Sequence, residues 1–236
     1  MTATKPKKMS RARLADPADP EAILRLGEKA YRAILRGLFD RTIPAGAFLS
    51  QAELMKLLDL PVQPLRDALR ALESEGLVKI HPRSGIQFTK ADLELARSTY
   101  QFRSIIERPA ARAFAETGDA AEIQALIDDH HALIALVETT ELGAESLAAL
   151  DSIEQRLHGG IISSLRNPLV ETTARRLKNY VALVRMDRLV TKPLVLRTLR
   201  EHLDILTACA ARDGDAAEAA LSHHFQAALQ RILGMV

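Results

Sequence analysis

Apolar residues recur at helical spacing through almost the whole chain, and this pattern most limits what the chain can fold into. Between Glu21 and Phe39, and again across residues 92–236, they fall three or four positions apart, on one face of a helix. Ala and Leu are abundant, only 4% of the residues are aromatic and none is Trp, which is a helix-forming composition. Residues 77–80 and 86–88 alternate instead, as short β-strands do. The sequence therefore predicts a mainly α-helical fold.

The N-terminal part, residues 21–91, is expected to form three helices followed by a hairpin. The helices are expected at residues 21–39, 51–58 and 61–74, and the strands at 77–80 and 86–88. Ser50 is a good N-cap for the second helix, and Glu53 completes a capping box there. Gly76 follows the third helix, where glycine commonly terminates one. Three helices, short turns and a hairpin form the outline of a winged helix-turn-helix domain.

In a winged helix-turn-helix, the third helix enters the major groove and the wing contacts flanking backbone or the minor groove. Arg66 and Arg70 lie one turn apart on the expected third helix, near Gln63, and Arg83 lies at the tip of the hairpin. We therefore expect these four residues to contact double-stranded DNA. Three short helices and a hairpin also make many domains that do not bind DNA, so the pattern alone leaves that alternative open.

Charge divides unevenly along the chain, although the net charge is only +2. Residues 1–91 hold 16 Lys and Arg against 10 Asp and Glu, whereas residues 92–236 hold 16 against 20. A basic N-terminal part favours an anionic partner such as nucleic acid. Residues 1–20 are polar, basic and contain three prolines, and we expect them to form a flexible arm.

The single cysteine, Cys209, excludes an intramolecular disulfide and any cysteine-rich zinc or iron–sulfur site. A metal site in this chain must therefore use histidine and carboxylate, and Cys209 itself is expected to be a small core residue. No apolar run approaches the roughly 18 residues of a membrane helix, and the basic start lacks the apolar core of a signal peptide. We expect no membrane association and a cytoplasmic location.

Residues 92–236 are expected to form an all-α antiparallel bundle of six or seven helices, large enough to enclose a small-molecule pocket. The first helix spans 92–108, and Pro109 is expected to start or kink a further segment that ends at residue 117. The remaining helices are expected at residues 119–140, 145–165, 168–189, 194–212 and 215–233.

Three histidines of this bundle are spaced as ligands of one divalent metal ion. Glu154 and His158 are four residues apart and share a helix face. His202 and His224 each lie 11 residues from Asp213, which occupies the turn between two helices, so both are ~16 Å from that turn and level with each other. Two level imidazoles and a carboxylate–imidazole pair can surround one ion. A single buried histidine is more often a hydrogen-bonded core residue, and that alternative stays open here.

The other four histidines are assigned to different roles. His81 belongs to the wing, and His223 competes with His224, although the apolar register favours His224. His130 and His131 follow two aspartates and are expected to lie on a solvated helix face.

Residues 34–88 resemble the DNA-binding domain of GntR-family transcriptional regulators. The segments that carry the resemblance are Pro44–Ser50, Pro64–Leu69, Leu72–Val78 and Pro82–Gly85. The family's third helix usually opens Ser-Arg-x-Pro-Val-Arg-Glu-Ala-Leu. This chain keeps Pro64, Arg66, Ala68 and Leu69 but has Pro61 and Val62 in place of the opening Ser-Arg. The family's first arginine reaches the operator, so the resemblance implies an atypical operator or weaker affinity here.

Residues 92–236 are similar to the FadR-type ligand-binding domain, the FCD domain, which follows this DNA-binding domain in one GntR branch. The matching segments are Arg103–Glu107 with Ala110 and Ala111, Glu154–His158 with Asn167 and Pro168, Glu201–Leu206, and Asp213 with Ala217 and His224. Many members hold a metal through Asp-x-x-x-His and two later histidines, which correspond to Glu154, His158, His202 and His224. The resemblance implies a divalent ion, zinc first and nickel or manganese as alternatives.

Such domains bind a small carboxylic acid at the metal, and the resemblance implies Arg103 and Asn167 as effector-binding residues. A guanidinium matches two carboxylate oxygens in a planar fork, although Arg103 could equally be an ion-pair partner of Glu107 at i+4. The expected function is a regulator, and on resemblance a repressor, that binds a palindromic operator as a homodimer and responds to a metabolite. It is not expected to be an enzyme, because no nucleophile motif, phosphate loop or clear general base accompanies the metal site. A metal-dependent enzyme or a metal-ion sensor using the Glu/His₃ site remains the alternative.

Overall fold

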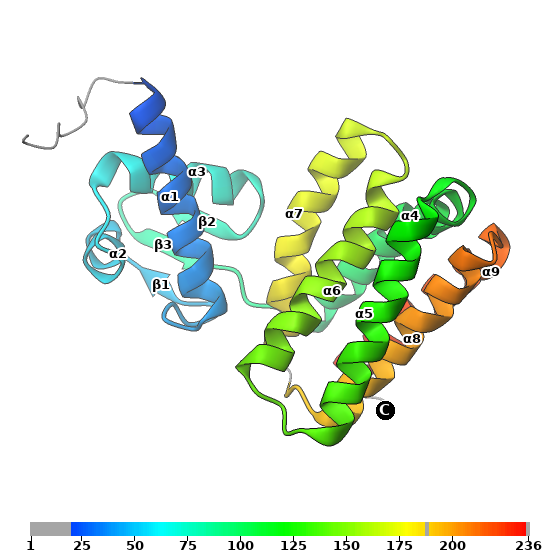
Figure 1. The fold of residues 1–236 in the computed structure, drawn as a ribbon. Coiled ribbons are helices and arrows are strands. Elements are labelled where there is room, and N and C mark those ends of the chain that lie inside the picture. The colour runs from blue at the N-terminus through cyan, green and yellow to red at the C-terminus, as the bar shows by residue number, and fades with distance from the viewer. Residues whose placement is uncertain (1–19, 187–188, 235–236) are drawn as a thin grey trace, which may run out of the picture. The chain divides into compact units, whose positions relative to one another are not determined.

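The computed structural model describes residues 20–186 and 189–234, and the chain divides after Thr89 into two compact units. The first unit, residues 1–89, contains α1 (Pro20–Phe39), β1 (Phe48–Leu49), α2 (Gln51–Leu58), α3 (Val62–Ser74), β2 (Val78–His81) and β3 (Gly85–Phe88) (Figure 1). The mainly α fold with an N-terminal winged helix-turn-helix is confirmed. The basic arm expected over residues 1–20 lies almost wholly outside the described residues.

The small sheet of the first unit has three antiparallel strands in the order β1-β3-β2. Ile86 of β3 pairs with Ile80 on one side and with Leu49 on the other. The expectation of a two-stranded hairpin is therefore incomplete, because β1 is a two-residue strand, too short to show alternation in the sequence. This third strand fixes the base of the wing to the turn that precedes α2.

Helices α2 and α3 begin and end where the sequence places caps. The Ser50 hydroxyl accepts a hydrogen bond from the backbone N–H of Glu53, and Glu53 Oε2 accepts one from the N–H of Ser50, which completes the expected capping box. Gly76 after α3 has φ +77, a conformation that glycine adopts without strain. Leu65, Leu69 and Leu72 bury one face of α3 and leave the opposite face to solvent. That solvent face is the one available to DNA.

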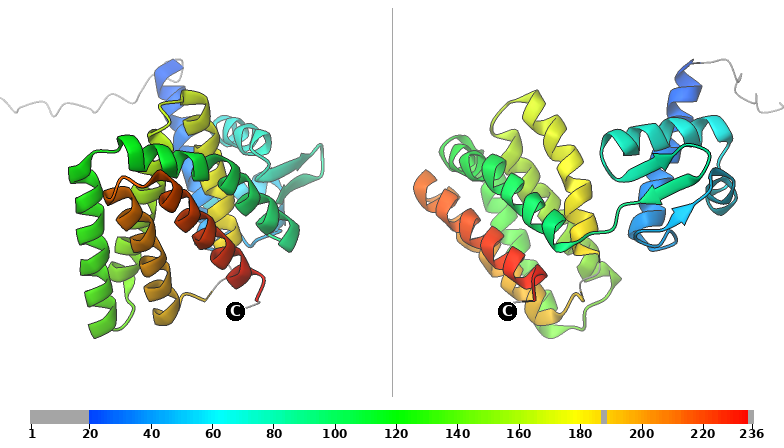
Figure 2. Two further views of the ribbon diagram at one scale, coloured as in Figure 1. Left: turned by 90° about the vertical axis from the view of Figure 1, so that its right-hand side faces the viewer. Right: turned by 180° about the vertical axis from the view of Figure 1, so that it is seen from behind.

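The second unit, residues 90–236, is a bundle whose helices are α4 (Leu93–Thr117), α5 (Ala120–Thr139), α6 (Ala144–Ser163), α7 (Pro168–Arg185), α8 (Lys192–Ala210) and α9 (Gly214–Ile232). Helix α4 packs against α6, α7, α8 and α9, and α5 packs against α6 and α8 (Figures 1 and 2). The Asp213 side chain caps α9 by accepting from the N–H of Ala216, so the α8–α9 hairpin turns where the sequence indicates.

Helix α4 runs without a break through Pro109, so the separate segment considered from the sequence does not exist. Proline removes one N–H from the helix, the one that would bond the carbonyl of Ile105. Buried residues of α4 lie on both sides of Pro109, with Arg103 and Glu107 before it and Ala110 and Phe114 after it. Packing of these buried residues against the other helices of the bundle offsets the free energy lost with that hydrogen bond.

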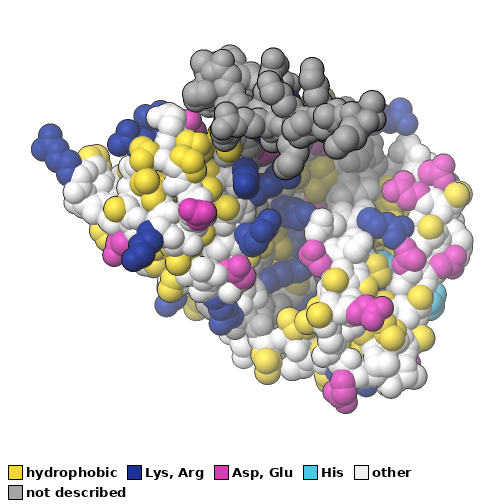
Figure 3. Space-filling model, turned by 60° about the vertical axis from the view of Figure 1, so that its left-hand side comes forward, with side chains coloured by type: hydrophobic (Ala, Val, Ile, Leu, Met, Phe, Trp, Pro, Cys, Tyr) yellow, Lys and Arg dark blue, Asp and Glu magenta, His cyan; other side chains and the backbone are white. Residues whose placement is uncertain are grey.

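No helix among residues 20–186 and 189–234 has the length and apolar character needed to cross a membrane. Figure 3 shows one face of the molecule, where basic side chains are interspersed with acidic and apolar ones. Histidine appears on that face only as small areas at one edge, which agrees with the burial of most of the bundle's histidines.

Candidate metal centre and nucleic-acid interface

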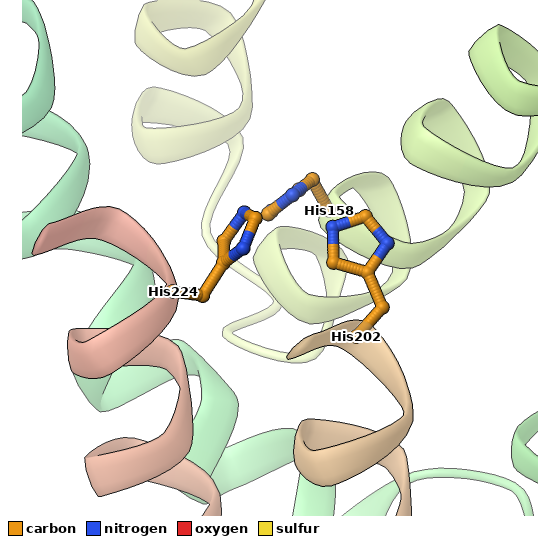
Figure 4. Close-up of side chains that lie close together, drawn as sticks. All are labelled: His158, His202 and His224. Carbon is orange, nitrogen blue, oxygen red and sulfur yellow. The ribbon is translucent and has the colours of Figure 1, made fainter. Parts of the chain in front are cut away.

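Three histidines from three helices converge inside the bundle: His158 of α6, His202 of α8 and His224 of α9 (Figure 4). One ring nitrogen from each lies within 4.8 Å of the corresponding atoms of the other two. The rings of His202 and His224 are 4.7 Å apart at their centroids, so the two residues are level across the α8–α9 hairpin. All three side chains are buried.

The Nδ1 atom of each of these histidines is engaged on the side away from the cluster. His158 Nδ1 lies 2.7 Å from Glu107 Oε2, His224 Nδ1 lies 2.8 Å from Glu201 Oε2, and His202 Nδ1 lies 3.2 Å from His130 Nε2. The three Nε2 atoms are buried and have no hydrogen-bond partner among the described residues. Buried polar nitrogens are rarely left in that state unless a ligand, an ion or water completes them.

The carboxylates behind the cluster are ionised, because arginines and hydrogen bonds hold them in that form. Burial raises the pKa of Glu107, but Arg103 and His158 outweigh it and bring the pKa to about 2. Burial likewise raises the pKa of Glu201, but the hydrogen bonds from Arg231 and His224 outweigh it and bring the pKa to about 2. Each carboxylate can thus accept a hydrogen bond from the Nδ1–H group of its histidine.

Two histidines of the cluster, His202 and His224, are held neutral by burial. Burial lowers the pKa of His202 well below its usual range, and the nearby His224 adds to this effect. Burial lowers the pKa of His224 to about 4, although its hydrogen bond to Glu201 opposes the shift. A neutral imidazole whose Nδ1 carries the proton presents a lone pair at Nε2, the form that binds a metal.

Glu154 lies beside the three histidines but is engaged elsewhere. Its Oε2 accepts a hydrogen bond from Arg185 Nη1 at 2.7 Å, and its oxygens lie 3.6 Å from His202 Nε2 and 3.9 Å from His158 Nε2. Burial raises the pKa of Glu154, but opposing effects, the charge of Arg185 first among them, outweigh it and bring the pKa well below the usual range. The carboxylate is therefore an anion next to the cluster.

These residues fit a divalent ion. Imidazole nitrogens bind zinc at about 2.0–2.1 Å, and outer hydrogen bonds from the second ring nitrogen to carboxylates are the usual way of orienting such ligands. Three buried Nε2 atoms without a hydrogen-bond partner among the described residues, two of them on rings backed by ionised carboxylates, provide this chemistry. Nickel and manganese are also bound by imidazole and carboxylate ligands, so the donor set does not single out one metal.

The polar side chains proposed for DNA contact lie on the solvent face of α3 and at the wing tip. Gln63, Arg66 and Arg70 are all exposed. Their contacts are at the surface of the first unit: Arg66 Nε donates to Gln51 Oε1 of α2 at 3.2 Å, Gln63 Nε2 donates to Asp67 at 3.0 Å, and Arg70 lies 3.9 Å from Asp67. Such weak surface contacts can be exchanged for contacts with DNA.

At the wing tip, Arg83 is exposed in the turn between β2 and β3, with φ +66. Val62 is the first residue of α3 and is 39% exposed, so an apolar side chain stands on the surface where the third helix begins.

Two protein families match the chain, one on each unit. Residues 26–88 match the family described as bacterial regulatory proteins, gntR family, and residues 98–227, more than half the chain, match the FCD domain. The chain belongs to the GntR family of transcriptional regulators. Its FCD domain places it in the FadR-like branch, and the matched families consist of regulators rather than enzymes.

Relatives of this GntR chain are regulators as well. It is 29% identical over 203 residues to the HTH-type transcriptional repressor RspR of Escherichia coli strain K12, covering 85% of this chain and 86% of RspR. It is 23% identical over 191 residues to the Nta operon transcriptional regulator of Aminobacter aminovorans, covering 81% and 87% of the two chains.

Solved structures share the fold of this GntR chain. A GntR transcriptional regulator from Rhodococcus sp. RHA1 matches with a TM-score of 0.70 at 21% identity, over 92% of this chain and 99% of that one. McbR/YncC of E. coli matches with a TM-score of 0.66 at 17% identity, over 90% and 97%.

The two residues of this GntR chain expected to bind an effector have different surroundings. Arg103 is buried and donates from Nε to Glu107 Oε1 at 2.7 Å, as in the ion-pair alternative, while its guanidinium stacks 4.4 Å over the Phe225 ring. Its Nη1 is buried and has no hydrogen-bond partner among the described residues. Asn167 is an exposed N-cap of α7, whose Oδ1 accepts from the N–H groups of Leu169 and Val170. These cap contacts give no support to an effector role for Asn167.

The prediction that His130 lies on a solvated face is wrong: its side chain is 0% exposed and contacts His202. The signal was present, because His130 is four residues after Leu126 and three before Leu133, on the buried stripe of α5. His131 is exposed, as expected. Sequence reasoning gave no role to Glu201 and Arg185. Glu201 precedes His202 on α8, but its contact with His224 depends on the side-chain packing of α8 against α9, and Arg185 reaches Glu154 from α7.

Proposed function

We propose that this GntR-family chain is a repressor whose affinity for operator DNA is controlled by a small carboxylate bound at a divalent metal centre in the FCD domain. The observation that carries the proposal is the convergence of three buried Nε2 atoms, from His158, His202 and His224, that have no hydrogen-bond partner among the described residues. These three residues would hold the ion, zinc first and nickel or manganese as alternatives, with Glu154 as a neighbouring carboxylate.

A bound divalent ion supplies open coordination positions that a carboxylate can occupy. Arg103 supports this class of effector, because Glu107 accepts hydrogen bonds from both Arg103 and His158 and so keeps the guanidinium next to the cluster. Arg103 Nη1 has no partner among the described residues, although it is buried, which leaves one N–H edge to meet an anion. We do not assign Asn167 a part in this site, since its amide oxygen caps α7.

DNA binding is proposed to use Gln63, Arg66 and Arg70 of α3 in the major groove and Arg83 of the wing on the flanking backbone. A homodimer would place two such helices about 34 Å apart on a palindromic operator. Effector binding would act through the linkage at residues 90–96, where the second unit begins. The name of the relative RspR, a repressor, supports repression as the direction of control.

The metal centre is tested by elemental analysis of the full-length protein after reconstitution with zinc, nickel or manganese in turn and removal of excess ion. Wild type should retain about one ion per chain, and His202→Ala should retain much less, because each ligand contributes a large share of the affinity. Exposed His131 offers the matched control, since His131→Ala removes a histidine outside the cluster. A wild type that retains no zinc, nickel or manganese would refute the metal centre.

The effector is tested by thermal unfolding of the zinc-loaded protein against a panel of small carboxylic acids and their uncharged amides, with and without chelator. A carboxylate that raises Tm only when zinc is present, and that lowers affinity for DNA in an anisotropy titration, supports the proposal. A change in DNA affinity caused by zinc alone, with no acid having any effect, would instead identify a metal-ion sensor.

A further inference from the structure

His130 of α5 lies against the side of His202 that faces away from the histidine cluster. Its Nε2 atom is 3.2 Å from His202 Nδ1, the two rings meet edge to face with centroids 5.4 Å apart, and both side chains are 0% exposed. The other ring nitrogen of His130, Nδ1, lies 2.6 Å from the backbone carbonyl oxygen of Leu126. His130 is thus held between its own helix and His202.

The proton positions in this chain of contacts follow from its fixed end. A carbonyl oxygen only accepts hydrogen bonds, so the proton of the first contact lies on His130 Nδ1. His130 is 0% exposed, where a charged imidazole is costly, so the ring carries one proton, at Nδ1, and its Nε2 is an acceptor. The contact to His202 then needs a proton on His202 Nδ1, and a neutral His202 must present a bare lone pair at Nε2.

The other two histidines have a different kind of partner at Nδ1. His158 and His224 each donate from Nδ1 to a carboxylate, Glu107 or Glu201, and an arginine holds each carboxylate. His202 has a neutral imidazole in place of the carboxylate. The acceptor behind His202 is therefore uncharged, and its orientation depends on the Leu126 carbonyl.

We propose that His130 is a positioning residue that fixes the Nδ1–H tautomer of His202 and so directs the Nε2 lone pair of His202 into the cluster. This inference rests on the proposed metal centre for its effect on affinity, but the tautomer itself exists without metal. Loss of an outer hydrogen-bond partner of a metal-binding histidine typically lowers metal affinity 10–100-fold. We expect a loss of zinc affinity in that range when residue 130 can no longer accept a hydrogen bond from His202 Nδ1.

Matched substitutions separate hydrogen bonding from packing. His130→Leu fills similar space without an acceptor, His130→Gln supplies an amide oxygen that can accept from His202, and His131→Leu changes the exposed neighbour. Zinc affinity of the full-length proteins is measured by competition with a chromophoric chelator. We expect His130→Leu to lose about 10–100-fold, His130→Gln to recover most of it, and His131→Leu to match wild type.

The second readout is the tautomer of His202 in metal-free protein labelled with ¹⁵N-histidine, observed by long-range proton–nitrogen NMR correlation and assigned with His202→Gln. Wild type should show His202 protonated at Nδ1, whereas His130→Leu should show protonation at Nε2 or a mixture. Wild-type His202 protonated at Nε2 would overturn the inference without recourse to any variant. So would equal loss of affinity in His130→Leu and His130→Gln with an unchanged tautomer, which would indicate packing alone.

The two proposals fail in different ways. A wild type with the expected tautomer but no affinity for zinc would refute the metal centre and leave the role of His130 in fixing His202 intact. A wild type that binds zinc with undiminished affinity in His130→Leu would refute the role of His130 and leave the metal centre intact.

Discussion

Arg185 Nη1 donates a 2.7 Å hydrogen bond to Glu154 Oε2, and so an arginine holds the carboxylate that lies beside the histidine cluster. Arg185 Nε also lies 3.3 Å from the Tyr100 hydroxyl, which helps to fix the guanidinium. Glu154 is therefore a partly buried anion with one strong partner, Arg185. It lies 3.6 Å from His202 Nε2, which has no hydrogen-bond partner among the described residues. Removing the arginine leaves this charge to be balanced by something else.

Arg185→Met should destabilise the metal-free protein by about 1.5–3 kcal/mol, because the partly buried Glu154 carboxylate loses its charged hydrogen-bond partner. Zinc should restore more stability to this variant than to wild type, since a cation in the cluster would then neutralise Glu154. Urea unfolding followed by circular dichroism, in EDTA and in zinc, measures both effects. Arg200→Met, which breaks the exposed pair with Glu138, should cost less than about 1 kcal/mol. Equal losses in the two variants would contradict this reading of Glu154.

Stability of the metal-free protein should fall between pH 7 and pH 5. The pKa of His224 is about 4 in the folded protein and about 6.5 in the unfolded chain. Between these two pH values the unfolded state therefore binds a proton at His224 and the folded state does not. The loss is about 2 kcal/mol for His224 at pH 5, and His202, whose pKa is also lowered, adds to it. Glu107 and Glu201 have pKa values of about 2 in the folded protein and near 4.5 in the unfolded chain. Their contribution to the free energy of unfolding is therefore lost only as the pH falls below about 4.5.

Urea midpoints in EDTA at several pH values check this dependence. His224→Gln removes one of the responsible groups and should flatten the profile, whereas His131→Leu should leave it unchanged. A midpoint that stays constant or rises as the pH falls from 7 to 5 would show that the buried histidines are already charged.

Arg66→Ala should weaken DNA binding by about 1–3 kcal/mol, because a guanidinium in the groove contacts base or phosphate with charge-assisted hydrogen bonds. The duplex is one selected by the wild-type protein from a random library, and the measurement is an anisotropy titration at several salt concentrations. A lost phosphate contact reduces the salt slope by about one, and a lost base contact relaxes sequence preference. Arg200→Ala, in the other unit, is the matched arginine control, and an effect as large as that of Arg66→Ala would argue against α3 as the recognition helix.

Val62→Arg should raise affinity for DNA and steepen its salt dependence by about one unit of slope, since it adds a cation at the start of the recognition helix. Val62 is 39% exposed, so a longer side chain can be accommodated without repacking. Val62→Ala controls for removal of the apolar side chain. Unchanged affinity in Val62→Arg would mean that this end of α3 lies away from the backbone and grooves of DNA.

Gly85→Ala should destabilise the wing by about 1–3 kcal/mol, because overpacking against rigid neighbours forces the backbone to move. A Cβ at Gly85 would lie 2.9 Å from the carbonyl oxygen of Leu49 and 2.8 Å from the Phe48 ring, at a φ of +156. Hydrogen exchange of the β1–β3 amides reports the loss. Gly27→Ala, in α1 with open space around it, should stabilise the protein by about 0.5–1 kcal/mol and so gives the opposite sign.

The level placement of His202 and His224 could be predicted because the rise per residue of two helices joined by one tight turn fixes it. No such rule relates α6 to that hairpin: the spacing of Glu154 and His158 places both on one helix face but does not fix where α6 packs, so the contact of His158 with Glu107 could not be foreseen. His130 was misplaced because two aspartates before it outweighed its register with Leu126. The partners Arg185 and Arg231 follow from helix packing, which depends on contacts between residues far apart in the chain.

A divalent ion held by His158, His202 and His224 would also cross-link the chain. Its three ligands come from three helices, α6, α8 and α9, so binding would close one loop between His158 and His202 and a second between His202 and His224. Closing these loops would reduce the entropy of the unfolded state, as a disulfide does. The chain has one cysteine and therefore cannot form an intramolecular disulfide for this purpose. Occupancy of the site would then set how firmly these three helices are tied together.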